Sequence, residues 1–273
     1  MKYLESAIKF LIKNWILAVP LFVLIALAAL LGGASNAAAS LSSLWGAFGN
    51  MGQLSNPSSL FSSLPAILPA VAVGGGIWAF LFNFVTIPAS YGLVNKSLDT
   101  GSASLNDIGS AISQNFVKYI MYFIGMIVLS IVLGLGSFIV LLILSLLTAL
   151  VKPLVILTVI VAIALFIGII ILMILLSMWL SAMIVDGLDV IAAAKKSIEV
   201  IKSCFWTVLG ITILVSIACG IAGWILGLLT IIPLIGPIIG PIIASIVPAA
   251  QTFVMIVFLL LIYREKTGKM NNL

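Results

Sequence analysis

The stretch LVILTVIVAIALFIGIIILMILL, residues 154–176, decides the fold class of this chain. Its side chains are apolar except for one threonine, and none of them is charged. About 20 such residues in helical conformation cross the hydrocarbon core of a bilayer, where no water is present to bond the backbone. The stretch therefore predicts a transmembrane helix.

The composition of the whole chain has the same character. Apolar residues make up 64% of it and charged residues only 7%, with a mean hydropathy of +1.41. A soluble domain has about 25% charged residues, so the composition indicates a polytopic membrane protein. The chain has no histidine, which is the commonest general base and metal ligand, and its two cysteines lie in apolar runs. We therefore expect no cofactor, no metal site and no catalytic residue, and a protein that is not an enzyme.

Six apolar runs are long enough to cross a membrane. They lie near 15–33, 66–94, 119–149, 154–185, 205–230 and 242–263. The expected fold is an all-α membrane bundle, a single domain over residues 1–273 in which six transmembrane helices form three hairpins. The connections outside the cytoplasm are then residues 34–65, 150–153 and 231–241.

The distribution of charge predicts the sidedness of these spans. Of the 12 lysines and arginines, all except Lys152 fall in the termini or in the two connections on the same side. Positive residues accumulate in cytoplasmic segments, so we expect both termini in the cytoplasm and the protein in the cell membrane of a prokaryote. Aromatic residues at the expected span ends, among them Trp15, Trp206 and Tyr263, are typical of the headgroup level.

A short amphipathic segment precedes the first, third and fifth spans. These segments read YLESAIKFLIKNW (3–15), SLNDIGSAISQNFVKY (104–119) and GLDVIAAAKKSIEVIKSCFW (187–206). Each is expected to form a cytoplasmic helix that lies in the membrane interface. The apolar face predicted for the third consists of Val190, Ile191, Ala194, Ile198 and Ile201. The repeated unit reflects either a triplication of the chain or convergence on the same physical demands.

Charged residues of these segments are the candidate contacts to lipid headgroups or to a partner. The lysines concerned are Lys9, Lys13, Lys118, Lys195, Lys196 and Lys202. Ser104 and Asp107 have the spacing of a helix cap. Asp186 and Asp189 lie where carboxylates complement the dipole of the third helix, which explains them better than an acid–base pair does.

The segment IIPLIGPIIGPIIASIVP, residues 231–248, is apolar but carries four prolines. Proline removes a backbone donor and clashes with the carbonyl four residues before it, so the segment is not expected to be helical throughout. We expect either a rigid outside cap that packs on the bundle or an element that lines a cavity.

Few polar side chains lie at depth in the expected spans. Asn83, Ser177, Ser181 and Gln251 fall at comparable depths on the three returning spans. They form either a polar cluster at the bundle axis or separate hydrogen bonds between helices.

The run WLSAMIVDGLDVIAAAKKSIEVIKSCFWTVLGITILVSI, residues 179–217, is the most distinctive part of the chain. It resembles prokaryotic integral-membrane proteins grouped with the membrane domain of glycerophosphoryl diester phosphodiesterases, which include the YciC-like proteins. The resemblance covers mainly residues 179–265 and rests on Asp186-Gly187, on Ala194, Lys195, Lys196 and Ser197, on Lys202, Phe205 and Trp206, and on Tyr263-Arg264-Glu265. It implies a lipid-associated or accessory membrane role without catalytic residues in this chain.

These features together predict a non-enzymatic multi-pass membrane protein that interacts with lipid or acts as an accessory or scaffolding protein in the cell envelope. Its expected partners are the bilayer with its anionic headgroups and a membrane or cytoplasmic protein, and not nucleic acid. The alternative is a permease or accessory subunit of a transporter, with residues 186–203 as a coupling helix that docks on a cytoplasmic ATPase. A channel is disfavoured, because no ring of charges and no filter sequence is visible.

Overall fold

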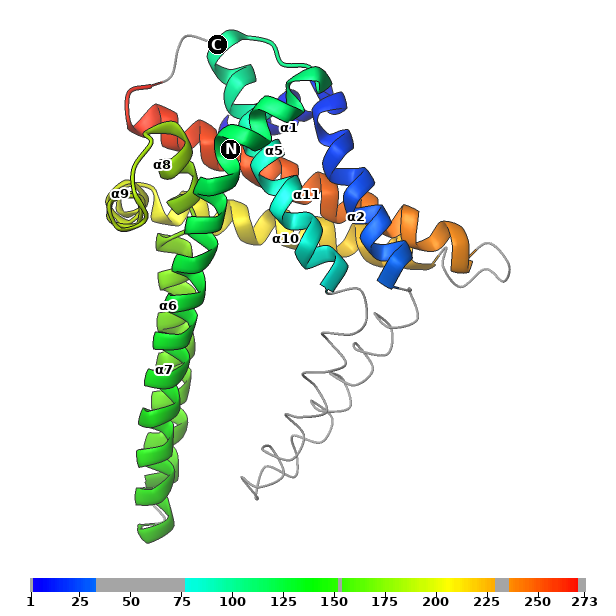
Figure 1. Ribbon diagram of the computed structural model, residues 1–273. Helices are drawn as coiled ribbons and strands as arrows, with labels where there is room; N and C mark the ends of the chain where they lie inside the picture. The colour runs from blue at the N-terminus through cyan, green and yellow to red at the C-terminus, as the bar shows by residue number, and fades with distance from the viewer. Residues whose placement is uncertain (1, 33–76, 152–153, 229–235, 270–273) are drawn as a thin grey trace. The chain divides into compact units, whose positions relative to one another are not determined.

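The computed structural model describes residues 2–32, 77–151, 154–228 and 236–269 (Figure 1). Every element within these ranges is a helix, which confirms the all-α class. The chain divides into two compact units. The first consists of residues 1–112 and 213–258, and the second of residues 113–212 and 259–273.

The first unit is organised around two helices that pack against each other, α2 (Val19–Gly32) and α5 (Ile77–Thr100). Helix α1 (Lys2–Lys13) and the 3-10 turn η1 (Trp15–Ala18) precede α2, and the turn η4 (Leu105–Asp107) follows α5. The core of this unit contains fully buried side chains from three helices, including Leu21, Leu93, Val94 and Phe253.

Helix α1 meets α2 at a bend of 91°. The α1 helix ends at Lys13, and the backbone of the next residue, Asn14, leaves the helical region with φ −120° and ψ 35°. The side-chain amide and the backbone N–H of Asn14 both donate to the carbonyl of Phe10, at 3.2 and 2.8 Å. Pro20 has no N–H to donate to the turn before it, which favours a break at this place. As a result, α1 lies across the axis of α2.

The second unit is built on a long hairpin of α6 (Ile108–Leu150) and α7 (Leu154–Leu175), of which α6 belongs to this unit from residue 113 onward. The two helices run antiparallel and side by side (Figure 1). Near the tip of the hairpin the hydroxyls of Thr148 and Thr158 share a hydrogen bond of 2.9 Å. Apolar side chains cover most of the exposed surface of both helices, as expected for helices that face lipid.

Two short helices form a corner at the other end of this hairpin, α8 (Trp179–Val185) and α9 (Val190–Lys202). Figure 1 looks almost along the axis of α9 while it shows α6 and α7 from the side, so α9 runs across the hairpin. After a break at Ser203 and Cys204 the chain continues as α10 (Phe205–Leu228), and the last helix is α11 (Gly236–Lys266).

Four helical stretches among the described residues are long and apolar enough to cross a membrane: Leu105–Thr148, Leu154–Val185, Phe205–Leu226 and Ile242–Lys266. They coincide with the third to sixth predicted spans. A fifth is present if the bent pair of α1 and α2 counts as one span. A total of six spans, paired as three hairpins, stays a prediction. Residues 33–76, which hold the first outside connection and residues 66–76 of the second predicted span, lie outside the described residues, and so do residues 152–153.

Two helix boundaries differ from the prediction. The second amphipathic segment is not a separate helix, because it runs without a break into α6, which has 43 residues. Helix α11 begins at Gly236 and so includes residues 236–241, which were expected in an outside connection. Pro237 falls in the first turn, where a missing N–H costs nothing because that N–H has no helical partner. Residues 231–235 of the proline-rich segment lie outside the described residues.

Candidate functional site

The corner between α8 and α9, residues 186–189, is shaped by three residues. Asp186 caps the end of α8, and Gly187 turns the chain with a φ of +67°, a left-handed conformation that costs glycine little. Asp189 precedes α9, and its carboxylate accepts a hydrogen bond of 2.8 Å from the backbone N–H of Ala192. The sequence predicts for Asp189 a carboxylate at the start of α9 that complements the helix dipole, and the structure shows that it also caps the helix.

Trp179 ties this corner to the hairpin. Its indole N–H donates to the carbonyl of Val190 at 2.7 Å, and its ring meets Tyr122 of α6 edge-on, with centroids 5.6 Å apart. Gly125 of α6 lies next to both partners, because a Cβ at this position would be 2.9 Å from the Trp179 ring and from the Val190 side chain. The absence of a side chain at residue 125 therefore allows the start of α9 to approach α6 closely.

The inner face of α9 packs within the second unit. Its buried residues are Ala193, Ser197, Val200 and Ile201. The Ser197 hydroxyl donates to the carbonyl of Leu175 at 2.8 Å. Leu175 is the last residue of α7, so this bond satisfies a carbonyl that the helix end leaves without a partner in the helix. Packing and this bond together fix α9 across the end of α7.

The outer face of α9 combines isoleucines with lysines. Ile191, Lys195, Ile198 and Lys202 follow one another at spacings of four, three and four, so they share one face of the helix. Ile191 is 69% exposed, and both lysines are exposed. Trp206, at the start of α10 and after the break at Ser203 and Cys204, is 80% exposed. The chain thus presents apolar and cationic side chains side by side on one exposed surface.

The apolar face predicted for α9 was wrong in its grouping. Its members separate, since Ile201 is buried whereas Ile191 is exposed. The helix packs through a neighbouring row that includes Ala193 and Ser197, and small or hydroxyl-bearing residues do not stand out in a hydropathy pattern. The outer face also combines both residue types, because Lys195 shares it with Ile191. Lys196 is paired with Glu199 at 3.1 Å.

Helix α1 of the first unit distributes its side chains around the helix as α9 does. Leu4 and Ala7 are buried, and the ring of Phe10 stacks on Phe253 with centroids 6.3 Å apart. The adjacent row is apolar and exposed, with Ile12 exposed by 69% and Ile8 by 42%. This helix therefore also has a packed apolar face beside an exposed one.

Lysines border the exposed row of α1. Lys13 is exposed, and Lys9 is paired with Glu5 at 2.7 Å. Trp15, directly after the bend, is 61% exposed. Among the other candidate lysines, Lys118 is half-buried and its ammonium lies 3.5 Å from the carbonyl of Ile184.

Asp186 has a second role that the sequence does not reveal. Its carboxylate accepts a hydrogen bond from the Tyr263 hydroxyl at 2.7 Å and another from the Lys269 ammonium at 2.9 Å. Gly268, with a φ of +69°, turns the chain back after α11 so that Lys269 reaches this site. Tyr263 is fully buried against protein, and its expected position at the headgroup level stays a prediction. No local pattern links residues 186 and 263, which are 77 positions apart.

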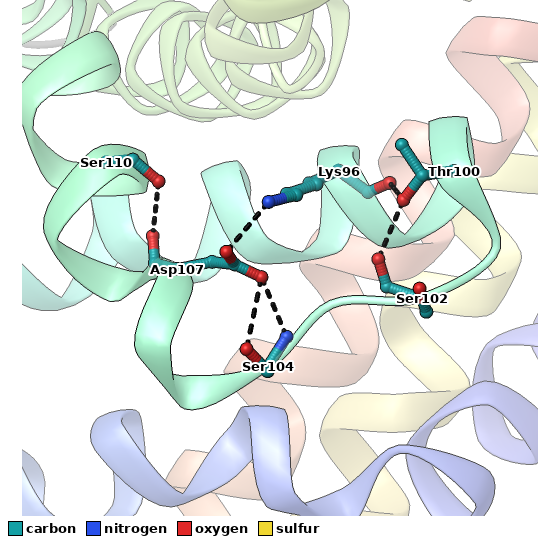
Figure 2. Close-up of polar contacts among 6 residues, drawn as sticks. All are labelled: Lys96, Thr100, Ser102, Ser104, Asp107 and Ser110. Atoms are coloured by element: carbon teal, nitrogen blue, oxygen red, sulfur yellow. Dashed lines mark hydrogen bonds and ion pairs between the residues drawn. The ribbon is translucent and has the colours of Figure 1, made fainter.

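The connection between α5 and α6 is fixed by its own contacts (Figure 2). Asp107 pairs with Lys96 at 2.7 Å and accepts from the backbone N–H of Ser104 at 2.9 Å, as the capping spacing predicts. The Lys96 ammonium holds the pKa of Asp107 below its ordinary value, and the Ser104 N–H adds to this effect. Asp107 lies in the turn η4, before the apolar part of α6. The helical stretch Leu105–Thr148 has 44 residues, about twice the ~20 that a crossing needs, so it has room for a polar start outside the hydrocarbon core.

The four polar candidates within the spans lie in different units. Asn83 is exposed and Gln251 half-buried in the first unit, and Ser177 and Ser181 belong to the second. The hydroxyl oxygens of Ser177 and Ser181 are buried and have no hydrogen-bond partner among the described residues. A cluster of all four stays a prediction.

Comparison with known proteins places the chain in a family. Residues 3–264 match the family described as a domain of unknown function, DUF7847. No curated protein and no solved structure matches the chain. The family match runs from α1 to Arg264, near the end of α11, and so includes the corner, α9 and both exposed surfaces described above. The chain belongs to the DUF7847 family.

Proposed function

We propose that this chain is a non-enzymatic multi-pass protein of the cell membrane that binds anionic lipid at the cytoplasmic surface and serves there as an accessory or scaffolding protein. In this proposal α1 and α9 lie in the membrane interface with their lysines among the headgroups. The observation that carries it is the outer face of α9, where exposed Ile191 lies beside exposed Lys195 and Lys202 on a helix that runs across an apolar hairpin.

The dimensions of the second unit support this arrangement. From Gly125, next to the start of α9, to the tip of the hairpin at Leu150, about 26 residues of α6 rise ~39 Å at 1.5 Å per residue. The 22 residues of α7 rise ~33 Å. The hydrocarbon core of a bilayer is ~30 Å thick. A hairpin that crosses it therefore has its tip at one surface and α9 at the other.

The side chains of the outer face suit an interface better than water or hydrocarbon alone. The exposed side chain of Ile191 is unfavourable in water and favourable at the acyl boundary. Lysines extend their apolar stems along such a surface and keep the ammonium at the headgroups. The exposed indole of Trp206, at the start of α10, has the amphipathic character that favours this level.

Helix α1 gives a second, separate line of support. Its 91° bend relative to α2 places it in the plane of the membrane if α2 crosses the membrane. Its exposed row, Ile8 and Ile12, again lies beside lysines, here Lys9 and Lys13. The same combination thus occurs on two helices that precede different spans.

The experiment compares lipid retention by the wild-type chain and by the triple variant K195Q/K196Q/K202Q. The full chain is placed in nanodiscs of equal parts phosphatidylglycerol and phosphatidylcholine, and native mass spectrometry counts the lipids that stay bound. Each lysine near an anionic surface contributes about 1 kcal/mol, so binding of phosphatidylglycerol is expected to weaken about fivefold per lysine removed. Phosphatidylcholine retention should change little.

Two control variants keep the test specific. K195R/K196R/K202R retains the charge and should retain the anionic lipid. Glu199→Gln removes the carboxylate paired with Lys196 and should increase retention. Equal retention of phosphatidylglycerol by the wild-type chain and by K195Q/K196Q/K202Q would contradict the proposal. Alternatively, a cytoplasmic ATPase could copurify with the wild-type chain from native membranes in equal amount and be lost from K195Q/K196Q/K202Q. That result would support a transporter subunit that uses residues 186–203 as its coupling helix.

A further inference from the structure

Helix α10 has an exposed tryptophan near each of its ends. Trp206 is 80% exposed and Trp224 is 72% exposed, the two highest values for large apolar side chains in the described part of the chain. They are 18 positions apart, which is about five turns of 3.6 residues, so both indoles project from the same face of the helix. Because α10 has no break between Phe205 and Leu228, this relation follows from the helix alone.

The separation of the two indoles matches the thickness of a membrane. At a rise of 1.5 Å per residue, 18 residues extend ~27 Å along the helix axis. The hydrocarbon core of a bilayer is ~30 Å thick, and tryptophan is enriched at both of its borders with the headgroups. There the apolar ring contacts acyl chains while the indole N–H reaches water. An α10 that crosses the membrane can therefore place one indole at each headgroup level.

Between the two indoles the same face of α10 is apolar and open. The residues on it follow one another at steps of three or four and are Gly210, Ile213, Ile217 and Ile221. The three isoleucines are 49%, 59% and 58% exposed, and no atom of another helix lies within 4 Å of the position that a Cβ of Gly210 would occupy. The whole helix has no charged residue. The face is thus an apolar strip bordered by one indole at each end.

The order of these side chains favours lipid over a protein partner as the occupant of the face. In protein interfaces, tryptophan anchors gather near the centre of the contact, in desolvated pockets. On α10 the centre of the strip is aliphatic and the tryptophans stand at its two ends. This is the order that hydrocarbon between two headgroup layers requires.

We infer that this face of α10 fits a bilayer whose hydrocarbon core is ~27 Å thick, with Trp206 and Trp224 at its two headgroup levels. The inference deepens the proposed function and rests on it only in that the chain spans a membrane, because the lysines of α9 have no part in it. A thicker bilayer draws an indole into hydrocarbon, and a thinner one leaves isoleucines in contact with water. The two tryptophans thus determine which bilayer thickness stabilises the protein most. Helices α6 and α7 contain no tryptophan and adapt to such a bilayer by tilting.

The test measures how stability depends on bilayer thickness. The full-length protein is reconstituted in a series of phosphatidylcholine bilayers of increasing acyl-chain length, and its melting temperature is recorded in each. The wild-type chain is expected to have its highest melting temperature where the core is ~27 Å thick. In the exchange variant I221W/W224I the second indole lies three residues closer to Trp206, and the composition is unchanged. The optimum should then move to a bilayer thinner by ~4.5 Å.

Ile221→Leu is the matched control, because it changes the same position without moving an indole. Its optimum should equal that of the wild-type chain. An optimum at the same thickness in the exchange variant as in the wild-type chain would overturn the inference. A melting temperature of the wild-type chain that does not depend on bilayer thickness would overturn it too.

Membrane depth gives a second test that leaves both tryptophans in place. Residues 213 and 217 lie two positions on either side of the midpoint between the two indoles. Nitroxide labels at these residues, in a chain whose two cysteines are replaced by alanine, should have the same depth, each ~3 Å from the bilayer centre. Labels at different depths, or labels that a second copy of the chain shields from oxygen dissolved in the lipid, would overturn the inference.

These outcomes are separable from the outcome for the lysines of α9, because phosphatidylcholine has no net charge. If the optimum does not move in I221W/W224I while K195Q/K196Q/K202Q loses phosphatidylglycerol, the inference fails and the proposed headgroup contact stands. If the optimum moves as expected while K195Q/K196Q/K202Q keeps phosphatidylglycerol, the inference stands and the proposed headgroup contact fails.

Discussion

The start of α6 and the helix α9 have similar sequences and different structures. Both are amphipathic segments that precede a long apolar run, and both contain lysine near an aromatic residue. The first continues without a break into a helix of 43 residues, whereas the second is a separate helix of 13 residues that runs across the hairpin. Hydropathy is therefore not what separates a helix from the span that follows it.

The difference lies in what ends each helix. At the end of α9 the Ser203 hydroxyl donates to the carbonyl of Val200 at 2.8 Å, and the Cys204 thiol donates to the same carbonyl at 3.5 Å. Both bonds go to the carbonyl of Val200, in the last turn of α9, where carbonyls lose their partners within the helix. The segment from Ile108 to Lys118 has no such end, because α6 continues as one helix to Leu150. As a consequence, α9 can present an exposed apolar row to the interface, while the start of α6 is an extension of its span.

The strongest way to break this arrangement is to push α9 away from α6. Gly125→Leu places side-chain atoms where a Cβ alone would be 2.9 Å from Trp179 and Val190. Overpacking of this kind costs about 1–3 kcal/mol, so we expect a lower melting temperature and faster hydrogen exchange over residues 190–202. Exchange over residues 105–112 should not change. Gly134→Leu, which meets no atom within 4 Å, is the control and should melt like the wild-type chain.

A second variant removes the acceptor beneath the corner. Asp186→Ala leaves the buried Tyr263 hydroxyl without the oxygen to which it donates, at a cost of about 1–3 kcal/mol in the free energy of unfolding. Tyr263→Phe should lower the free energy of unfolding by less. It removes the hydroxyl donor, and the Asp186 carboxylate that remains is partly solvated and still paired with Lys269. The double variant Asp186→Ala with Tyr263→Phe should be no worse than Asp186→Ala alone. Fully additive losses in chemical denaturation would show that the two side chains do not interact.

A smaller effect is expected from removing the caps, and it sharpens the comparison. Asp189→Ala removes the N-cap of α9 and should cost about 1 kcal/mol. Because isolated helices below about 12–15 residues are marginal in water, exchange should increase along the whole of α9. Asp107→Ala should loosen only the first turn before α6, since the long helix continues beyond it. Equal spread of exchange in both variants would contradict the proposed difference between the two segments.

The smallest effect concerns pH and the connection between α5 and α6. Lys96 lowers the pKa of Asp107. The ion pair therefore stabilises the connection fully at pH values above the ordinary aspartate pKa of ~3.9. That contribution is lost as pH falls through the lower pKa of the folded state. Carboxyl ¹³C NMR should show Asp107 titrating below ordinary aspartates, and Lys96→Gln should move the midpoint upward. A midpoint that does not respond to Lys96→Gln would show that the pair is not formed.

The sequence predicts those features that depend on local pattern. The long apolar runs predict the helices that can cross a membrane, and the spacing of Ser104 and Asp107 predicts their cap. Asp189 is recognisable as a cap because a periodic apolar run follows it. The positions of α1 and α9 as helices are also predictable from their amphipathic periods.

Features that depend on contacts between distant residues could not be predicted in this way. The acceptor role of Asp186 requires Tyr263 and Lys269, and neither stands near it in the chain. The packed face of α9 uses Ser197, which is polar in sequence and finds its partner on α7.

The central claim is that α9 lies in the plane of the membrane interface while α6 crosses the bilayer, and membrane depth tests it most directly. Nitroxide labels are placed singly at residues 191, 195, 198 and 202 of α9 and at residues 127, 131, 135 and 139 of α6, in a chain whose two cysteines are replaced by alanine. Power-saturation electron paramagnetic resonance in liposomes then reports the depth of each label. We expect one shared depth near the headgroups along α9 and a steady increase of ~6 Å for every four residues along α6. A depth that changes along α9 as steeply as along α6, or labels on α9 that do not contact lipid at all, would contradict the account.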